Sequence, residues 1–227
     1  MAEASTPTGP VKLVILPRTR AALGRDGLRR YLEAVHGPMV VDETAVSGRF
    51  TSYVHHYAQD WATSGGISGD MAILEDRDAV TIIRTPTMAD LALSKACDGY
   101  RKRIGPDEDN FREAEGSLAL LADEIEAVPG VDCAGHKLFI FRSALPKRFD
   151  DWADQIGMIV RDNGLCGAVI NAARTIEGQF PFIQFDEVGL SASCDPATIA
   201  GIIHQSALAH FGNVETKVLL AEPVRFI

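Results

Sequence analysis

The stretch Val11-Lys-Leu-Val-Ile-Leu-Pro-Arg18 decides the fold, because a counterpart of it stands near the middle of the chain. The β-rich run Val11 to Leu16 predicts a strand that Pro17 closes. Lys137-Leu-Phe-Ile-Phe-Arg142 predicts a similar strand, and Leu145-Pro146-Lys147 follows it as Leu16-Pro17-Arg18 follows the first. The shared position of these triplets, together with the element order around them, indicates an internal duplication.

The elements around the first stretch are predicted to follow the order β-α-β-β-α-β. Apolar residues at helical spacing indicate the helices, and β-rich runs between turn residues indicate the strands. Gly37-Pro38 is expected to end the first helix, and Gln59 to Arg77 to form a long loop. The expected strands are Val11–Leu16, Val46–Ala58, Ala79–Arg84 and Ser117–Leu121, and the expected helices are Arg25–His36 and one that begins at Thr87.

The second half is predicted to repeat that order. Its expected strands are Lys137–Arg142, Cys166–Ala173, Pro181–Val188 and Val214–Leu220, and its expected helices are Phe149–Val160 and one that begins at Asp195-Pro196. The predicted class is α+β, with two ferredoxin-like βαββαβ units in tandem. We expect a flexible tail over 1–10, one unit over 11–128 and another over 129–227. Their uncovered sheet faces must pack together, as one barrel.

Composition excludes several classes of partner. The 227 residues carry a net charge of −9, which argues against nucleic acid and anionic membranes as partners. No apolar run is long enough to span a bilayer, and the N-terminus does not resemble a signal peptide, so a cytoplasmic location is expected. The four cysteines are widely spread and form no Cys-x-x-Cys pair, and no nucleotide-binding glycine motif is present.

The segment Tyr31-Leu-Glu-Ala-Val-His-Gly-Pro-Met39 resembles the EthD family, whose first helix ends in W/Y-x-x-x-H-G-P-L. Here the spacing is one residue longer, and Met39 replaces Leu. The acidic turn Pro106–Phe111 before the strand Ser117–Leu121 is also similar to that family. The resemblance covers about residues 11–123, while the second half resembles it in element order only.

The resemblance implies a dimeric α/β barrel with both halves supplied by one chain. Similar proteins include cofactor-free dehydratases and decarboxylases of aromatic polyketide pathways. The wider superfamily includes isomerases, cofactor-free monooxygenases and haem enzymes, so the fold does not decide the function.

One predicted strand places an unusual set of side chains on one face. Alternation puts Tyr53, His55 and Tyr57 together and turns His56 to the other face. A histidine can move a proton, and a tyrosine hydroxyl can hold an enolate oxygen. His36, at the end of the first helix, either caps carbonyl groups or takes part in catalysis. These five residues are the candidate catalytic groups.

A second set of residues is expected to bind substrate. It comprises Trp61 in the long loop and Asn171, Arg174, Gln184 and Asp186 in the second half. The last four could line a cavity shared by the halves or face solvent at a sheet edge. The adjacent His55 and His56 face opposite sides, so they make a poor chelating pair, and no metal or cofactor is expected.

Together these features predict a cofactor-independent lyase or isomerase, of the dehydratase or decarboxylase type. Its substrate would be a small aromatic or polyketide-like carbonyl compound, held in a pocket between the sheets, with the functional cavity in the first half. His55 would be the acid–base group, and Tyr53 and Tyr57 would orient the substrate. Two alternatives stay open: a non-catalytic ligand-binding or stress-response barrel, and a haem-binding barrel. Association into a homodimer also stays open.

Overall fold

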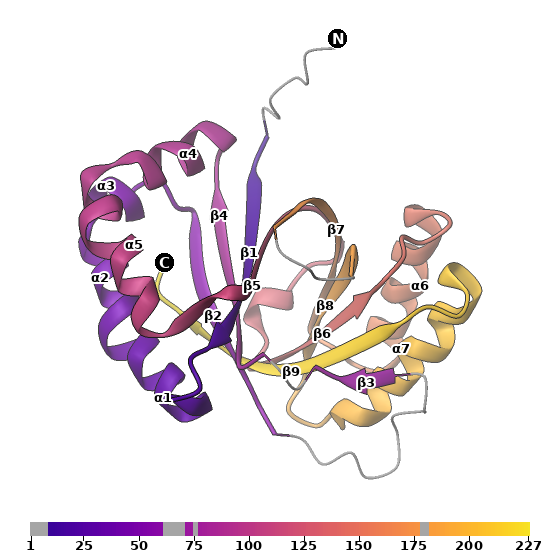
Figure 1. Ribbon diagram of the computed structural model, residues 1–227. Coiled ribbons are helices and arrows are strands. Elements are labelled where there is room, and N and C mark those ends of the chain that lie inside the picture. The colour runs from indigo at the N-terminus through magenta and orange to yellow at the C-terminus, as the bar shows by residue number, and fades with distance from the viewer. Residues whose placement is uncertain (1–8, 61–70, 75–76, 178–181) are drawn as a thin grey trace.

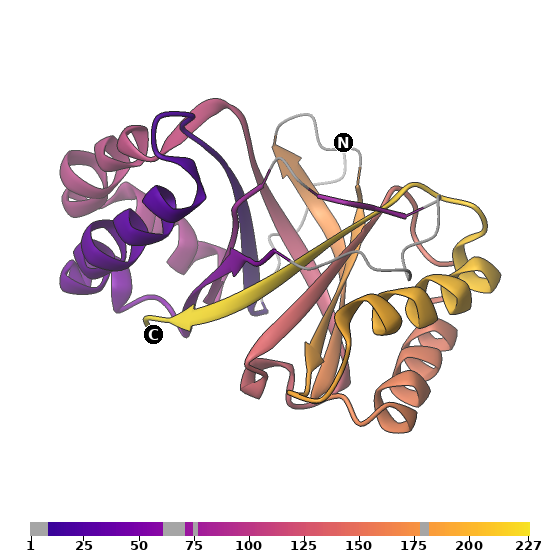
Figure 2. The ribbon, with the colours of Figure 1, turned by 90° about the horizontal axis from the view of Figure 1, so that it is seen from below.

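The computed structural model describes residues 9–60, 71–74, 77–177 and 182–227. In this part of the chain, eight strands form an antiparallel barrel in the order β2-β4-β1-β5-β7-β8-β6-β9, and pairing of β2 with β9 closes it. A short strand, β3, pairs in parallel with β9. The helices lie outside the barrel in two groups, one for each half of the chain (Figures 1 and 2). The predicted α+β class is confirmed.

The strands of the first half are β1 Val11–Thr19, β2 Ser52–Ala58, β3 Met71–Ile73, β4 Ala79–Thr85 and β5 Arg112–Val128. Those of the second half are β6 His136–Arg142, β7 Gly167–Glu177, β8 Gln184–Leu190 and β9 Thr216–Arg225. With β3 set aside, the strands of each half lie in the same relative order, β2-β4-β1-β5 in the first and β7-β8-β6-β9 in the second.

The helical segments of the first half are α1 Gly24–Tyr31, η1 Leu32–His36, α2 Gly37–Asp42, α3 Thr44–Ser47, α4 Met88–Ala96, η2 Tyr100–Ile104, α5 Gly105–Asp107 and η3 Glu108–Asn110. Those of the second half are η4 Val131–Cys133, α6 Phe149–Asp162 and α7 Pro196–Phe211. Among the described residues, no helix combines the length and apolar character needed to cross a bilayer.

The first helix does not end at Gly37-Pro38, contrary to the sequence prediction. The chain stays helical to Asp42, because η1 is a π-helical turn in which the Gly37 N–H donates to the Leu32 carbonyl. A π turn changes the hydrogen-bond register, so the N–H that Pro38 lacks is not needed there. The same device recurs at η2, where the Gly105 N–H donates to the Tyr100 carbonyl before Pro106.

Two strand predictions also need correction. Val46 lies in the short helix α3, and β2 begins only at Ser52. The long strand β5 extends well beyond the predicted Ser117–Leu121, because it pairs with β1 through its first part and with β7 through its last. β9 likewise pairs with β6 and then with β2. These two strands join the halves edge to edge.

Candidate active site

A cavity of about 390 Å³ lies in the first half, between the outer face of the sheet and the helices. Its sheet wall includes Leu13, Ile83 and Ala119, and its helix wall includes Val40 and Leu91. The pocket was expected between the sheets, inside the barrel. There the cluster that includes Phe139, Phe141 and Phe185 fills the interior with buried apolar side chains. The cavity is therefore outside the barrel, although it is in the half that the sequence indicated.

A chain of hydrogen bonds runs along the sheet wall of this cavity. The Tyr53 hydroxyl lies 2.8 Å from His55 Nε2, and His55 Nδ1 lies 2.7 Å from the Thr81 hydroxyl. All three residues are buried and contact the cavity. Strand alternation and pairing of β2 with β4 place them on one face, because His55 is the register partner of Thr81.

Burial keeps the side chains of Tyr53 and His55 uncharged. The removal of water lowers the pKa of His55 well below its ordinary value, and the nearby His36 and His56 lower it further. Burial also raises the pKa of Tyr53 well above its ordinary value. His55 and Tyr53 are therefore both neutral near pH 7. They can donate and accept hydrogen bonds, but neither is poised to take a proton from a substrate.

A second polar group reaches the cavity from the helix side. His36, at the end of the first π turn, places Nδ1 at 2.9 Å from Asp107 Oδ2. Asp107 also accepts hydrogen bonds from the Tyr31 hydroxyl at 2.5 Å and from Asn110 at 3.1 Å. The Phe111 ring packs edge-on against the His36 ring, with 4.7 Å between centroids. The imidazole is thus fixed on two sides.

The hydrogen bonds keep Asp107 ionised. Burial by itself would raise the pKa of this carboxyl, but the hydrogen bonds from Tyr31, His36 and Asn110 hold the pKa below its usual value. A carboxylate at Nδ1 fixes the tautomer in which Nδ1 carries the proton. Nε2 of His36 is then the basic nitrogen, and no described residue forms a hydrogen bond with it. The arrangement is that of a general base with its orienting group.

Polar side chains also mark one end of the cavity. The Tyr100 hydroxyl donates to Glu108 Oε1 at 2.9 Å, and Arg112 Nε donates to Glu108 Oε2 at 3.1 Å. These three residues contact the cavity together with the exposed Lys95. The remaining lining is largely apolar and aromatic, which is the usual character of a site for a small organic molecule.

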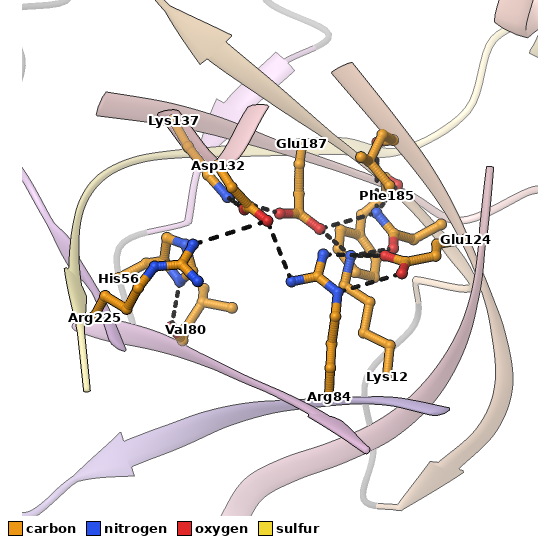
Figure 3. Close-up of polar contacts among 12 residues, drawn as sticks. Lys12, His56, Val80, Arg84, Glu124, Asp132, Lys137, Phe185, Glu187 and Arg225 are labelled. Carbon is orange, nitrogen blue, oxygen red and sulfur yellow. Dashed lines mark hydrogen bonds and ion pairs between the residues drawn. The ribbon is translucent and has the colours of Figure 1, made fainter. Parts of the chain in front are cut away.

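Two candidate catalytic residues lie away from the cavity. Tyr57 packs under α1, with the Arg29 guanidinium 5.0 Å from its ring centre, and burial raises its pKa. His56 points into the barrel, where Nδ1 lies 3.1 Å from the Val80 carbonyl oxygen (Figure 3). Burial and the charge of Lys137 lower the pKa of His56 to about 3. The structure therefore brings together only three of the five, Tyr53, His55 and His36.

The predicted substrate-binding residues do not gather around this cavity. Asn171 lies inside the barrel, where its Oδ1 accepts a hydrogen bond from Lys12 at 2.7 Å. Gln184 and Asp186 lie under the helices of the second half and bind Arg142. Arg174 forms an ion pair with Asp123. Trp61 lies outside the described residues, as does most of the predicted loop Gln59–Arg77.

The barrel interior holds a separate charged cluster, shown in Figure 3. The buried carboxylate of Glu187 binds both Lys12 and Lys137, and Lys137 also pairs with Asp132 at 2.7 Å. Lys12 and Lys137 occupy matching places in β1 and β6, the first strand of each half. Within this cluster each lysine is paired with a carboxylate. Because Lys12 belongs to the first half and Glu187 to the second, the ion pairs connect the two halves inside the barrel, which is a structural role.

Sequence reasoning missed Asp107 and Thr81. Asp107 belongs to the acidic turn that resembles EthD, but nothing in the sequence placed that turn beside His36. One signal was present, because Gly105-Pro106 repeats Gly37-Pro38 and marks a second π turn. Thr81 could have been found only from the register of β2 against β4.

The comparisons with known proteins concern the family of the first half and the fold of the whole chain. The sequence model of the EthD domain matches residues 20–115, which run from the end of β1 to the start of β5. This match confirms the resemblance seen in the first half. Among curated proteins, none has a sequence that matches this chain.

Several solved structures share the whole architecture. An anthrone oxidase-like protein has a TM-score of 0.58 at 11% identity, over 96% of this chain and 92% of the other. A protein of Lactobacillus acidophilus, provisionally named a monooxygenase, has a TM-score of 0.51 at 9% identity, over 96% and 95%. A provisionally named chlorite dismutase has a TM-score of 0.52 at 11% identity, over 96% and 95%. At these identities the similarity shows the fold alone, a dimeric α/β barrel.

Proposed function

Because residues 20–115 carry an EthD domain, we propose that this chain is an enzyme that removes a proton from a carbon acid. The substrate would be a small aromatic or polyketide-like carbonyl compound, held in the first-half cavity. The observation that carries the proposal is the His36–Asp107 pair, whose His36 contacts the same cavity as Tyr53, His55 and Thr81. One group can take a proton while the other holds the oxygen that becomes negative.

His36 is the proposed base, in place of His55. Its Nε2 accepts the proton, and the ionised Asp107 at Nδ1 stabilises the resulting imidazolium. General-base catalysis by a positioned histidine contributes roughly 10²- to 10⁴-fold to a rate. His55 is a weaker choice because its burial disfavours the protonated form. Its proposed role is to orient Tyr53.

Tyr53 is the proposed donor to the substrate oxygen. When the Thr81 hydroxyl donates to His55 Nδ1, Nε2 carries the proton and donates to the Tyr53 oxygen. The Tyr53 O–H is then free to donate to a carbonyl oxygen in the cavity. Its raised pKa keeps it protonated, so it stabilises a developing enolate without giving up its proton.

The fate of the enolate would set the reaction class. Loss of hydroxide from the neighbouring carbon gives a dehydratase, and return of the proton to another carbon gives an isomerase. In a decarboxylation, the same oxygen site would hold the enolate that loss of CO₂ creates. Oxidation is a further outcome, supported by the fold neighbour named anthrone oxidase-like. Anthrone and O₂ would then give anthraquinone and water, one of each.

Proton abstraction can be measured without knowledge of the natural substrate. Anthrone in D₂O, under argon, exchanges its methylene protons, and NMR follows the loss of their signal. The wild type should accelerate this exchange, and His36→Ala should lower the acceleration by about 10²-fold or more. Asp107→Asn should lower it by a smaller factor. His136→Ala, which changes an exposed histidine of the second half, should not alter it.

The outcomes separate the proposal from its rivals. Equal exchange by His36→Ala and the wild type would overturn the assignment of the base. Binding of anthrone with no exchange would favour a non-catalytic ligand-binding or stress-response barrel. Under air, an oxygen electrode distinguishes the fates, since only the oxidation consumes O₂, in an amount equal to the anthraquinone formed.

A haem-binding barrel is the second candidate, and the same histidine favours it. Metal-ligating histidines commonly donate their other ring N–H to a carboxylate, as His36 does to Asp107. His36 would hold the haem iron through Nε2, and bound haem would supply redox chemistry. A Soret band in protein purified with haem, lost in His36→Ala, would support this candidate.

The strand order supports a division of the chain into two units. We infer that the halves are tandem ferredoxin-like units with a boundary near 128–129, because their strands have the same relative order. The first unit would carry the reaction and the second would complete the barrel. A homodimer and a cytoplasmic location stay predictions.

A further inference from the structure

We propose that Phe226, which follows the last strand of the second half, is a positioning residue of the first-half site. The inference rests on the proposed function and extends it, since it assigns part of the site to the other half of the chain. It concerns the placement of Tyr53 and His55 relative to His36. Phe226 does not contribute to the cavity lining, so its effect would be exerted through these residues.

Backbone pairing brings Phe226 to the site. β9 pairs with β6 first and then crosses to β2, with His55 opposite Val224. Beyond the strand, the Phe226 N–H donates to the Tyr53 carbonyl at 2.9 Å, and the Tyr53 N–H donates to the Ile227 carbonyl at 3.1 Å. Figures 1 and 2 show this end of the chain beside β2, on the side where the first-half helices lie.

The Phe226 ring contacts both members of the proposed oxygen site. Its centroid lies 5.4 Å from that of Tyr53 and 5.3 Å from that of His55, and it meets the His55 ring edge-on at 80°. Such edge-to-face contacts add a geometric preference to simple burial. Phe226 therefore restricts the ring that orients Tyr53.

The same ring also packs on the helix that carries the base. A Cβ on Gly37, the residue after His36, would lie 2.3 Å from Phe226 Cε1 and 2.8 Å from the Leu32 carbonyl oxygen. Only glycine leaves room for both the π turn and the phenylalanine ring. The position of Phe226, a residue of the other half, therefore helps to explain why residue 37 in His36-Gly37-Pro38 is a glycine.

One side chain therefore joins the two proposed working groups. It touches Tyr53 and His55 on the sheet and the backbone next to His36 on the helix. The distance between base and oxygen donor depends on how these two elements pack. A misplacement of about 1 Å between catalytic groups can cost about 100-fold in rate. Phe226 is placed to prevent it.

The test compares Phe226→Ala, Phe226→Leu and Phe149→Ala in the full chain. Phe149 is half-buried like Phe226 but packs on the core of the second half. Anthrone exchange in D₂O under argon gives kcat and KM. We expect Phe226→Ala to lower kcat by about 10-fold with KM changed less than about 2-fold, and Phe226→Leu to recover part of the loss. Phe149→Ala should lose stability and keep kcat.

A second readout does not depend on turnover. The ¹⁵N shifts of the His55 ring report which nitrogen carries the proton. The wild type should show one protonated and one bare nitrogen, and Phe226→Ala should move both signals toward averaged values. Unchanged kcat together with unchanged His55 shifts in Phe226→Ala would overturn the inference. Absence of exchange in the wild type would instead count against the proposed function, while the ¹⁵N result would still decide the role of Phe226.

Discussion

The two halves of the chain use the space between sheet and helices differently. In the second half, Trp152, Ile156, Ile203 and Phe211 fill that space with a continuous buried core. In the first half, the equivalent space holds a cavity of about 390 Å³ with polar side chains on two walls. Because the strands lie in the same relative order in both halves, the difference comes from side chains and from the π turns, which occur in the first-half helices.

The buried polar groups of the two halves also differ, in whether they contact one another or face a cavity. Under the second-half helices, Arg142 donates to Asp186 at 2.5 Å and to Gln184 at 2.9 Å, and its guanidinium lies between the rings of Trp152 and Phe211. This cluster fills its own space, and the Arg142 charge is paired with the Asp186 carboxylate. In the first half, His36 and Tyr53 face an open volume instead. A barrel built from two similar halves can thus assign stability to one and chemistry to the other.

The largest expected loss of stability follows from a substitution in the second half. Asp186→Ala would leave the Arg142 charge buried without its carboxylate, and loss of one partner from such a pair costs about 3–5 kcal/mol. Urea denaturation followed by circular dichroism measures this loss of unfolding free energy.

Asp107→Asn is the matched change in the first half. Its side chain also binds other side chains through hydrogen bonds, but we expect a smaller loss of stability and a clear loss of anthrone exchange. If Asp107→Asn destabilised the protein as much as Asp186→Ala and left exchange intact, the contrast between the halves would be refuted.

The next effect concerns the response of stability to pH, through two buried histidines of the first half. Burial keeps His55 and His56 neutral in the folded state, with the pKa of His56 at about 3. Below the ordinary histidine pKa of about 6.5, the unfolded chain takes up protons that the folded chain does not. Stability should therefore fall as pH drops from 7 to 5, by at most about 1.4 kcal/mol per pH unit for each histidine.

Urea titrations at pH 7, 6 and 5 test this slope, and His56→Gln should reduce it. Measurements at pH 5 and above avoid the titration of buried carboxyl groups such as Glu187, whose lowered pKa matters only in more acidic solution. A slope that His56→Gln leaves unchanged would show that other groups control the acid response.

A third change fills the cavity. Ala119 lies on its sheet wall in β5, so Ala119→Phe should occupy the volume that a ligand needs. We expect anthrone binding to weaken at least 10-fold, about 1.4 kcal/mol, with little loss of stability. Isothermal titration and thermal melts measure the two quantities. A large loss of stability without a loss of binding would mean that this space is core rather than a site.

The smallest expected loss of stability comes from removing a helix N-cap, and it should be similar in both halves. Thr87 caps α4 by accepting a hydrogen bond from the Asp90 N–H at 3.1 Å, and Asp195 caps α7 by accepting one from Thr198 at 2.9 Å. Thr87→Ala should cost about 1 kcal/mol of unfolding free energy, and Asp195→Ala should act in the same direction. Thermal melts measure both, and exchange activity should survive both changes.

Local sequence signals predicted the elements well. The β-rich runs near Val11 and Lys137 mark the first strand of each half, and Asp195-Pro196 marks the start of α7. Alternation along β2 placed Tyr53 and His55 together, because side-chain direction in a strand follows from position alone. The family motif also singled out His36 before its partner was known.

Long-range contacts could not be predicted in this way. Asp107 meets His36 only because two helical segments, each with a π turn, pack side by side, and Phe226 meets Tyr53 only because β9 crosses from one half to the other. The sequence also gave no sign that Gln184 and Asp186 bind Arg142 under the helices, because a polar residue in a strand can face solvent, a cavity or a buried partner.

A small aromatic carbonyl compound should bind in the first half of the chain and not in the second. A methyl NMR titration of the full chain with anthrone tests this most directly, since Leu13, Ile83 and Leu91 line the cavity, while Ile140, Ile156 and Ile203 lie in the second core. We expect shifts at the first group and none at the second. Shifts confined to the second group, or no shifts at saturating anthrone, would contradict it.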